Sequence, residues 1–157
     1  MDFKNLIKVF CLLVLFNAFV GYPQEVTENI RKQRKIGIEA SFLGPTQITS
    51  INFNYSITHN INIEVGGGMI GVYGGGKFFF GKKDKSWYWA PYLGAMYAYN
   101  HNLVISGEKN TFSMLYAPVG IQYLGKKGFT FAGEVAYVSS LEINTNIWGA
   151  IRFGYHF

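Results

Sequence analysis

The sequence is poor in cysteine, proline and charge. Its 157 residues include one cysteine, Cys11, and four prolines, and only 15% of them are charged. A single cysteine excludes a disulfide within the chain and any metal centre built from several thiolates. About a quarter of the residues are charged in a typical soluble domain, so a soluble enzyme of ordinary composition is also disfavoured.

A hydrophobic run long enough for a comfortable transmembrane helix is missing near the start of the chain. The run VFCLLVLFNAFV, residues 9–20, falls well short of the roughly 20 residues that a spanning helix needs. Lys4 and Lys8 precede this run, and a positively charged start followed by a short apolar run is the order of an export signal. We predict that residues 1–23 are a signal peptide; a retained anchor helix is the alternative, since the cleavage site is weak.

Basic residues are confined to a few short segments. Residues 24–34 are polar and aperiodic, which predicts a flexible periplasmic leader before the folded domain. The clusters RKQRK (31–35), GKKDK (81–85) and GKKG (125–128) contain nine of the 14 Lys and Arg residues, in a chain whose net charge is +5 at pH 7. An exported protein with charge placed in this way is expected to meet acidic lipid head groups or only water, and nucleic acid is not an expected partner.

Glycine, aromatic residues and a period of two are what the sequence does have. Nineteen glycines and 18% aromatic residues are typical of many strands joined by turns. From residue 35 to 157 apolar residues alternate with polar or small ones, which predicts eight strands, most of them about 9 to 12 residues long. Such strands cross a bilayer at a tilt of about 45°. The predicted strands are 36–42, 50–57, 61–69, 72–80, 87–99, 114–123, 129–137 and 147–157, and the facing of 87–99 is left open because both of its faces are apolar.

The connections between these strands fall into two sets. An even number of strands brings both termini to one side, which we assign to the periplasm together with the short links 58–60, 81–86 and 125–127. The other links are 44–47, 69–73, 101–111 and 139–146, and the two longest of them are expected to be external loops. The sequence therefore predicts an all-β protein, an eight-stranded antiparallel up-and-down transmembrane β-barrel over residues 35–157.

The charged residues within the strands all share the face opposite the aliphatic residues. A Lys or Arg facing lipid near the bilayer midplane costs about 2 to 4 kcal/mol, so we expect this face to line the lumen. Glu64 is predicted to pair with Lys77, and Arg152 with its neighbours from the first and seventh strands. A gated or proton-linked path is the alternative, but an eight-stranded barrel is just wide enough to be filled by its own side chains. The predicted lumen charge network is Glu39, Glu64, Lys77, Glu134 and Arg152.

The stretch VGGGMIGVYGGGKFFF, residues 65–80, resembles two nucleotide-binding motifs by spelling alone. Neither a helix nor a suitably placed acidic residue follows its GxGxxG, and Phe78 stands where a phosphate loop needs a hydroxyl. Gly66, Gly68 and Gly75 are instead expected to face the lumen and make room for bulky neighbours. The three histidines lack ligand spacing, so neither a metal nor a cofactor is expected.

The ending IWGAIRFGYHF resembles the C-terminal assembly signal of bacterial outer-membrane barrels, through Phe153, Tyr155 and Phe157. With the export signal and the strand count, residues 35–157 resemble the small barrels typified by the membrane domain of OmpA and by OmpX, and the short barrels of Bacteroidetes. The resemblance implies a monomer in the Gram-negative outer membrane, inserted by the barrel-assembly machinery among membrane lipid and lipopolysaccharide.

Three functions are compatible with these observations. The first is a structural or surface-interaction role without catalysis, in which the loops meet lipopolysaccharide or an external partner. The second is an enzyme that modifies lipid A, because two members of this architecture have such an activity. One of them uses external His, Asp and Ser residues, which are matched only loosely by His101, Ser106, Glu108 and Ser113. No catalytic residue is assigned. The third is a soluble periplasmic barrel that binds an apolar ligand, with aliphatic side chains inside and charges outside.

Overall fold

The computed structural model describes residues 29–46, 48–81, 88–105, 108–140 and 146–157. The predicted signal peptide, the start of the predicted leader and most of the link 81–86 lie outside these ranges.

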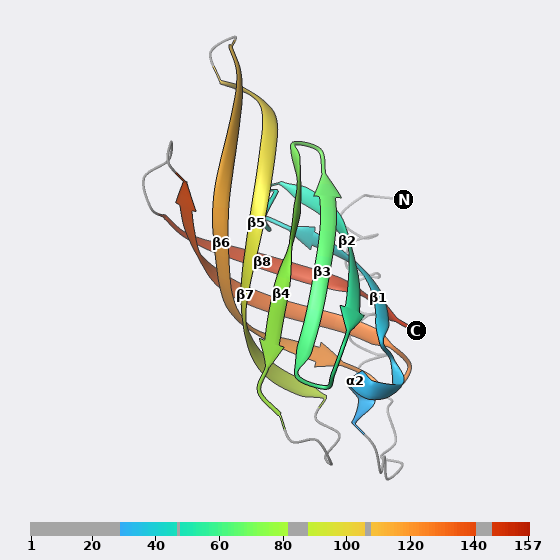
Figure 1. Ribbon diagram of the computed structural model, residues 1–157. Coiled ribbons are helices and arrows are strands. Elements are labelled where there is room, and N and C mark those ends of the chain that lie inside the picture. Colours follow the sequence, from blue (N-terminus) through green and yellow to red (C-terminus); the bar gives the residue numbers. More distant parts are fainter. Residues whose placement is uncertain (1–28, 47, 82–87, 106–107, 141–145) are drawn as a thin grey trace, which may run out of the picture.

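The described strands form one closed antiparallel barrel in which each strand pairs with its neighbours in the sequence (Figure 1). β1 pairs with β8, from Gly37 opposite His156 to Phe42 opposite Ile151, so the sheet has no open edge along this seam. The predicted fold class is confirmed. The strands are β1 (Ile36–Phe42), β2 (Thr49–Ser56), β3 (Ile61–Gly68), β4 (Gly71–Phe79), β5 (Trp89–Ile105), β6 (Glu108–Leu124), β7 (Phe129–Ser140) and β8 (Asn146–His156).

The outer wall of the barrel is apolar, whereas the lumen contains buried polar and charged side chains. Along β2 the side chains of Ile51, Phe53 and Tyr55 are exposed, while those between them, such as Asn52 and Asn54, are buried. This arrangement reverses that of a soluble protein, where the apolar face of a strand is buried. The alternation that predicted the strands is therefore the alternation between the outer wall and the lumen.

The structure shows which side chains of β5 face the lumen, a point that the sequence leaves open. Trp89, Leu93 and Tyr97 point outward, whereas Tyr92 and Met96 are almost fully buried inside. The outward set is the larger of the two apolar sets in this segment. Tyr92 can be buried in the lumen because its hydroxyl donates a hydrogen bond to a carboxylate there.

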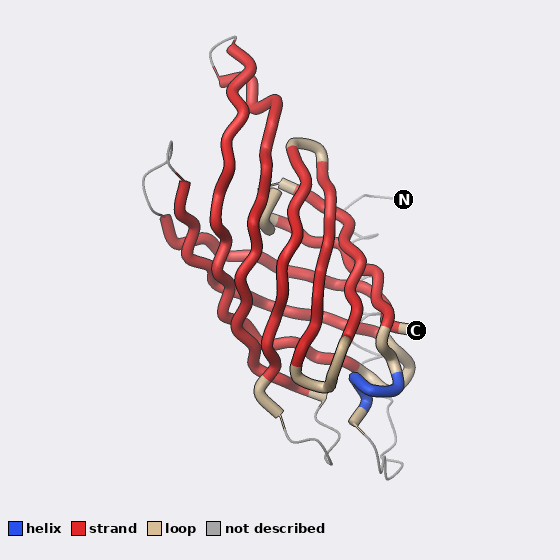
Figure 2. The backbone as a smooth tube through the Cα atoms, viewed as in Figure 1, coloured by secondary structure: helices blue, strands red, loops and turns tan. Residues whose placement is uncertain are grey.

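In its described residues, 101–105 and 108–111, the predicted external loop 101–111 is instead a continuation of two strands, and residues 106–107 lie outside the described ranges. β5 and β6 extend as a paired hairpin to Ile105 and Glu108, beyond a register shift between Asn100 and Leu103. Figure 2 shows this hairpin rising above the rest of the barrel. The polar residues of the segment predicted a loop, but it also contains Leu103-Val104-Ile105, whose strand preference and pairing prevail. β7 likewise runs to Ser140, so the predicted loop 139–146 is shorter, and residues 141–145 of it lie outside the described ranges.

The end of the predicted flexible leader is ordered. Residues Ile30–Gln33 form one turn of helix, α2, with Asn29 as N-cap: its side-chain oxygen accepts from the Arg31 backbone N–H at 3.0 Å. α2 lies at the lower end of the barrel in Figure 1, and Ile30 is only 1% exposed. A four-residue helix is too short to show a 3.6-residue period, which is why the sequence did not predict it. In the described residues no helix is long and apolar enough to cross a membrane.

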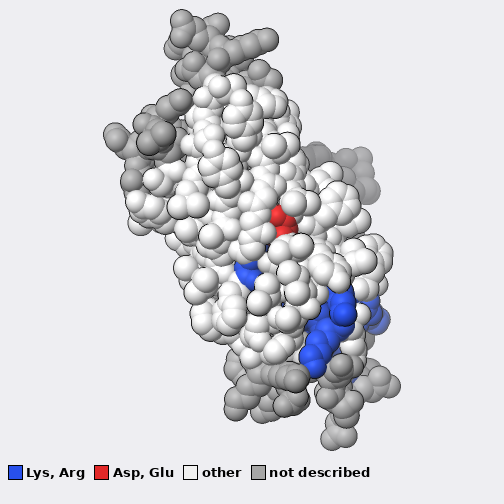
Figure 3. Space-filling view, in the orientation of Figure 1, with Lys and Arg blue, Asp and Glu red and all other residues white. Residues whose placement is uncertain are grey.

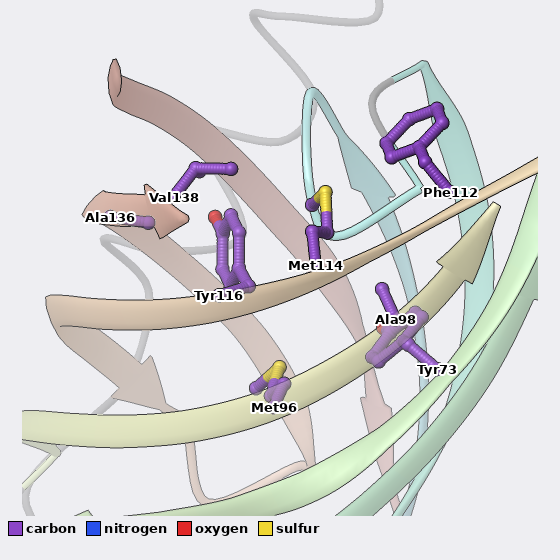
Figure 4. Close-up of a cluster of buried hydrophobic side chains, with 8 residues drawn as sticks. All are labelled: Tyr73, Met96, Ala98, Phe112, Met114, Tyr116, Ala136 and Val138. Carbon is purple, nitrogen blue, oxygen red and sulfur yellow. The ribbon is translucent and has the colours of Figure 1, made fainter. Parts of the chain in front are cut away.

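An apolar cluster packs part of the lumen. Its side chains come from β4, β5, β6 and β7 and point toward one another inside the barrel (Figure 4). The partly buried Trp148 of β8 packs against the cluster, and its indole N–H donates to the Leu43 carbonyl at 2.5 Å. The interior is therefore occupied by side chains, as expected for a barrel of eight strands. The cluster consists of Tyr73, Met96, Ala98, Phe112, Met114, Tyr116, Ala136 and Val138.

Candidate functional site: the charged lumen

Glu64 on β3 is the centre of the buried charges. Its Oε2 lies 2.6 Å from Lys77 Nζ on β4, and its Oε1 accepts from the Arg152 guanidinium on β8. All three side chains are at most 1% exposed. Glu64 and Lys77 are diagonal neighbours on adjacent strands, because Glu64 pairs with Gly75 and Lys77 with Asn62. β3 and β8 are not adjacent in the sheet, so the bond to Arg152 crosses the lumen.

Arg152 joins two carboxylates. Its second guanidinium nitrogen lies 2.9 Å from Glu134 Oε1 on β7, and the same nitrogen lies 3.8 Å from the Met96 sulfur on β5. A planar guanidinium has donors pointing in several directions, so one Arg can hold Glu64 and Glu134 together, which a Lys at the same position could not do as well. Arg152 therefore connects the carboxylates of β3 and β7 through the barrel.

Buried tyrosines add neutral hydrogen bonds to both of these carboxylates. The Tyr73 hydroxyl donates to Glu64 Oε1 at 2.7 Å, and the Tyr116 hydroxyl donates to Glu134 Oε1 at 2.8 Å. The Tyr92 hydroxyl donates to Glu134 Oε2. Buried charges are stable only when they are both paired and hydrogen-bonded, and these neutral donors supply the second condition.

Gly66 provides the space that Tyr73 needs. An ideal Cβ at Gly66 would lie 2.5 Å from Tyr73 Cε1, so the ring occupies the place of a side chain. We expect Gly66→Ala to push the ring away from Glu64 and to lower the free energy of unfolding by about 1 to 3 kcal/mol. The neighbouring Gly67 faces outward, with its nearest such contact at 3.6 Å, and Gly67→Ala is expected to change stability by less than about 0.5 kcal/mol. Urea unfolding of both variants makes the comparison, and equal losses would contradict the inward role of Gly66.

The position of Glu39 beside β8 predicted an ion pair with Arg152, but the two side chains do not pair in the structure. The Oε1 of Glu39 instead accepts from Gln122 Nε2 at 2.9 Å and lies 3.2 Å from His156 Nε2. The register explains the difference: Glu39 lies opposite Gly154, two residues from Arg152, whose guanidinium turns to Glu64 across the lumen. Of the two neighbours predicted for Arg152, only Glu134 is a partner in the described ion pairs.

Arg31 adds a third cation to the lumen from outside the strands. Its guanidinium lies 4.6 Å from the centre of the Phe79 ring and within 3.5 Å of both the backbone and the side-chain oxygen of Gln122. Burial lowers the pKa of Arg31 to about 10, and the negative charge of Glu39 opposes this shift. Arg31 therefore stays protonated at neutral pH.

All five residues of the predicted network, Glu39, Glu64, Lys77, Glu134 and Arg152, lie buried in the lumen. The sequence did not predict the roles of Arg31, Gln122 and His156. His156 and Gln122 fall on the inward face by their parity, which could have marked them as partners for a buried carboxylate. The sequence did not indicate a buried position for Arg31, because its segment shows no regular alternation of apolar and polar residues.

The residues of the predicted assembly signal lie on the outer wall. Phe153, Tyr155 and Phe157 are all exposed. Phe153 stacks on Phe42 of β1 with ring centres 5.6 Å apart, and Tyr155 meets Phe157 edge-on at 5.1 Å. The aromatic row thus continues across the seam where the barrel closes.

The described residues contain no group of three or more side chains suited to hold a metal ion. Of the residues weighed as mimics of a lipid A enzyme, Ser106 lies outside the described ranges. His101 is exposed and meets Tyr99 edge-on with ring centres 6.3 Å apart, and Ser113 is half-buried on β6.

Comparison with known proteins relates the chain to a solved barrel. No protein-family model matches the sequence, and no curated protein matches it either. The fold is similar to the crystal structure of the N-terminal β-barrel domain of Pseudomonas aeruginosa OprF, with a TM-score of 0.59 and 14% sequence identity. The match covers 79% of this chain and 98% of that domain. The chain thus shares the fold of this barrel domain.

Proposed function

We propose that the protein spans the Gram-negative outer membrane as a barrel with a filled lumen, and that its role is structural or in surface interaction. The observation that supports this proposal best is that apolar side chains lie outside the barrel and charged ones inside, the reverse of a soluble protein. Every described strand presents large apolar residues outward, and in Figure 3 the visible strand faces are nearly free of charge. A continuous apolar wall of this extent is unstable in water and matches the hydrocarbon core of a bilayer.

The lower end of the barrel fits the periplasmic side. The largest basic group visible in Figure 3 lies at this end, beside α2, together with the short connection between β6 and β7. The tall β5–β6 hairpin lies at the other end. Outer-membrane barrels have short periplasmic turns and longer external connections, so we place this hairpin outside, where it can meet lipopolysaccharide or an external partner.

The aromatic row at Phe153, Tyr155 and Phe157 supports insertion by the barrel-assembly machinery. A monomer is the proposed state, because closure of β1 on β8 leaves that seam with no unpaired edge to recruit a second chain. Likeness to OmpX and to the Bacteroidetes barrels rests on the pattern of the sequence alone and forms part of the same proposal.

A soluble barrel that carries an apolar ligand is disfavoured. That alternative requires aliphatic side chains inside and charges outside, whereas Glu64, Lys77 and Arg152 are buried and residues such as Val65 are exposed. A shallow apolar groove of about 560 Å³ lies on the outer wall, over β6, β7 and β8, where lipid would cover it. Activity on lipid A is the alternative function, and lipid A mass spectra that do not change on deletion or overexpression would eliminate it.

Cell fractionation tests the proposal. We expect the protein in the outer-membrane fraction, with faster electrophoretic migration before boiling than after it, as a folded barrel resists detergent until heated. Recovery from the soluble periplasm would contradict the membrane assignment. Migration that boiling does not alter would contradict a stable filled barrel.

A further inference from the structure

The lower mouth of the barrel contains a site with the chemistry of guanidinium recognition. The face of Phe79 lies 4.6 Å from Arg31 Cζ, and the two oxygens of Gln122 lie within 3.5 Å of one guanidinium nitrogen. Behind Gln122, its amide donates to the carboxylate of Glu39 at 2.9 Å. An aromatic face, carbonyl oxygens and a nearby carboxylate are the groups that favour a planar, weakly hydrated cation. We name Phe79, Gln122 and Glu39 the socket.

With His156 neutral, the strands alone leave the lumen one positive charge short. Among the described buried residues, the strands carry three carboxylates and two permanent cations, Lys77 and Arg152; the imidazole of His156, 3.2 Å from Glu39, is a cation only when protonated. Arg31, 4% exposed, is the third cation, and it comes from α2. An uncompensated carboxylate in a low-dielectric interior is costly, so the lumen of the isolated strands would attract one more cation. The carboxylates are Glu39, Glu64 and Glu134.

α2 is held in place by its side chains. A four-residue helix cannot be stable by itself, because nucleation costs more than so few hydrogen bonds return. Arg34 fixes its end: Nε donates to the Lys126 carbonyl at 2.8 Å and Nη1 to the His156 carbonyl at 3.1 Å. Arg34 thus ties the segment to the rim, whereas Arg31 enters the socket.

We propose that α2 is a tethered plug and that the socket is a binding site for a guanidinium group, which the chain's own Arg31 occupies. When Arg31 is absent, the socket takes a free guanidinium ion or an arginine side chain from another molecule. Recognition depends on the planar cation, so a simple monovalent cation does not replace it. This inference does not depend on the membrane proposal, because the folded barrel in detergent micelles suffices to test it.

Chemical rescue tests the socket. We expect Arg31→Ala to lower the temperature at which the fast-migrating, folded band of the purified barrel disappears on electrophoresis. Millimolar methylguanidinium is expected to raise this temperature again, with an effect that saturates as its concentration increases. Sodium and tetramethylammonium at the same concentration are expected to have no effect. Lys32→Ala is the matched control: it removes a positive charge from the same helical turn without emptying the socket, and methylguanidinium should stabilise neither this variant nor the wild-type protein.

A second variant keeps the test decisive if Arg31→Ala does not fold. Deletion of residues 29–33 removes α2 and opens the socket, and the same rescue is expected. Phe79→Leu in either background should abolish the rescue, because it removes the aromatic face. Equal stabilisation by all three cations, or by none, would overturn the proposal and leave Arg31 as a packing residue only.

Discussion

Arg152→Met is expected to lower the free energy of unfolding by about 3 to 5 kcal/mol, the cost of removing one partner from a buried ion network. Arg152 is fully buried and bonds both Glu64 and Glu134. Methionine fills a similar volume, so the loss comes mainly from the charge. Glu64 keeps Lys77, but Glu134 is left with tyrosine donors alone. Urea unfolding of the barrel in lipid vesicles measures the change.

The double variant Arg152→Met, Glu134→Gln separates charge from packing. Neutralising Glu134 removes the orphaned charge, so the double variant should be more stable than Arg152→Met alone. Lys127→Met, at an exposed turn position, is the control for the change of residue type, and we expect it to alter stability by less than about 0.5 kcal/mol. A loss below about 1 kcal/mol for Arg152→Met would contradict a structural role for the network.

Val65→Arg is expected to destabilise the barrel by about 2 to 4 kcal/mol in a bilayer. Val65 is 60% exposed and lies in the middle of β3, opposite Phe53 and Gly74, so its side chain would face the hydrocarbon core. An arginine there must lose its hydration or distort the bilayer. Comparing unfolding of the variant and the wild type in vesicles gives the magnitude.

Thr58→Arg provides the matched control for this prediction. Thr58 is exposed in the turn between β2 and β3, where an arginine stays in water. Its hydroxyl accepts from the backbone N–H groups of Asn60 and Ile61, so we expect a loss of about 1 kcal/mol, well below that of Val65→Arg. If the outer wall were in water, Val65→Arg would behave like Thr58→Arg. Equal effects of the two substitutions would therefore contradict the placement of the wall in lipid.

The strands were predictable because one simple pattern determines them. The bounds of β1 to β4 and of β8 lie within one residue of the prediction. In β2 every inward residue is Ser or Asn, and every outward residue after Thr49 is apolar and large, so the period of two is unambiguous. The same parity placed Glu64 and Lys77 on one face of adjacent strands, which sufficed to predict their pairing.

Contacts across the lumen could not be predicted in the same way. The bond of Arg152 to Glu64 joins strands that are not neighbours, so it depends on the stagger of the closed barrel and on side-chain length rather than on sequence spacing. Arg31 was missed for a related reason: its position is set by Phe79 and Gln122, which are distant in sequence. The long β5–β6 hairpin was missed because local polarity outweighed strand propensity in the prediction.

Nitroxide scanning of β2 tests the central claim most directly. Single cysteines at 51, 53 and 55, and at 52 and 54, are introduced with Cys11→Ser, spin-labelled and reconstituted in lipid vesicles. We expect the odd positions to collide readily with oxygen, which concentrates in the hydrocarbon core, and the even positions to be shielded from both oxygen and a polar nickel chelate. Odd positions that collide mainly with the chelate, or no alternation between odd and even, would contradict a membrane-spanning barrel with a filled polar lumen.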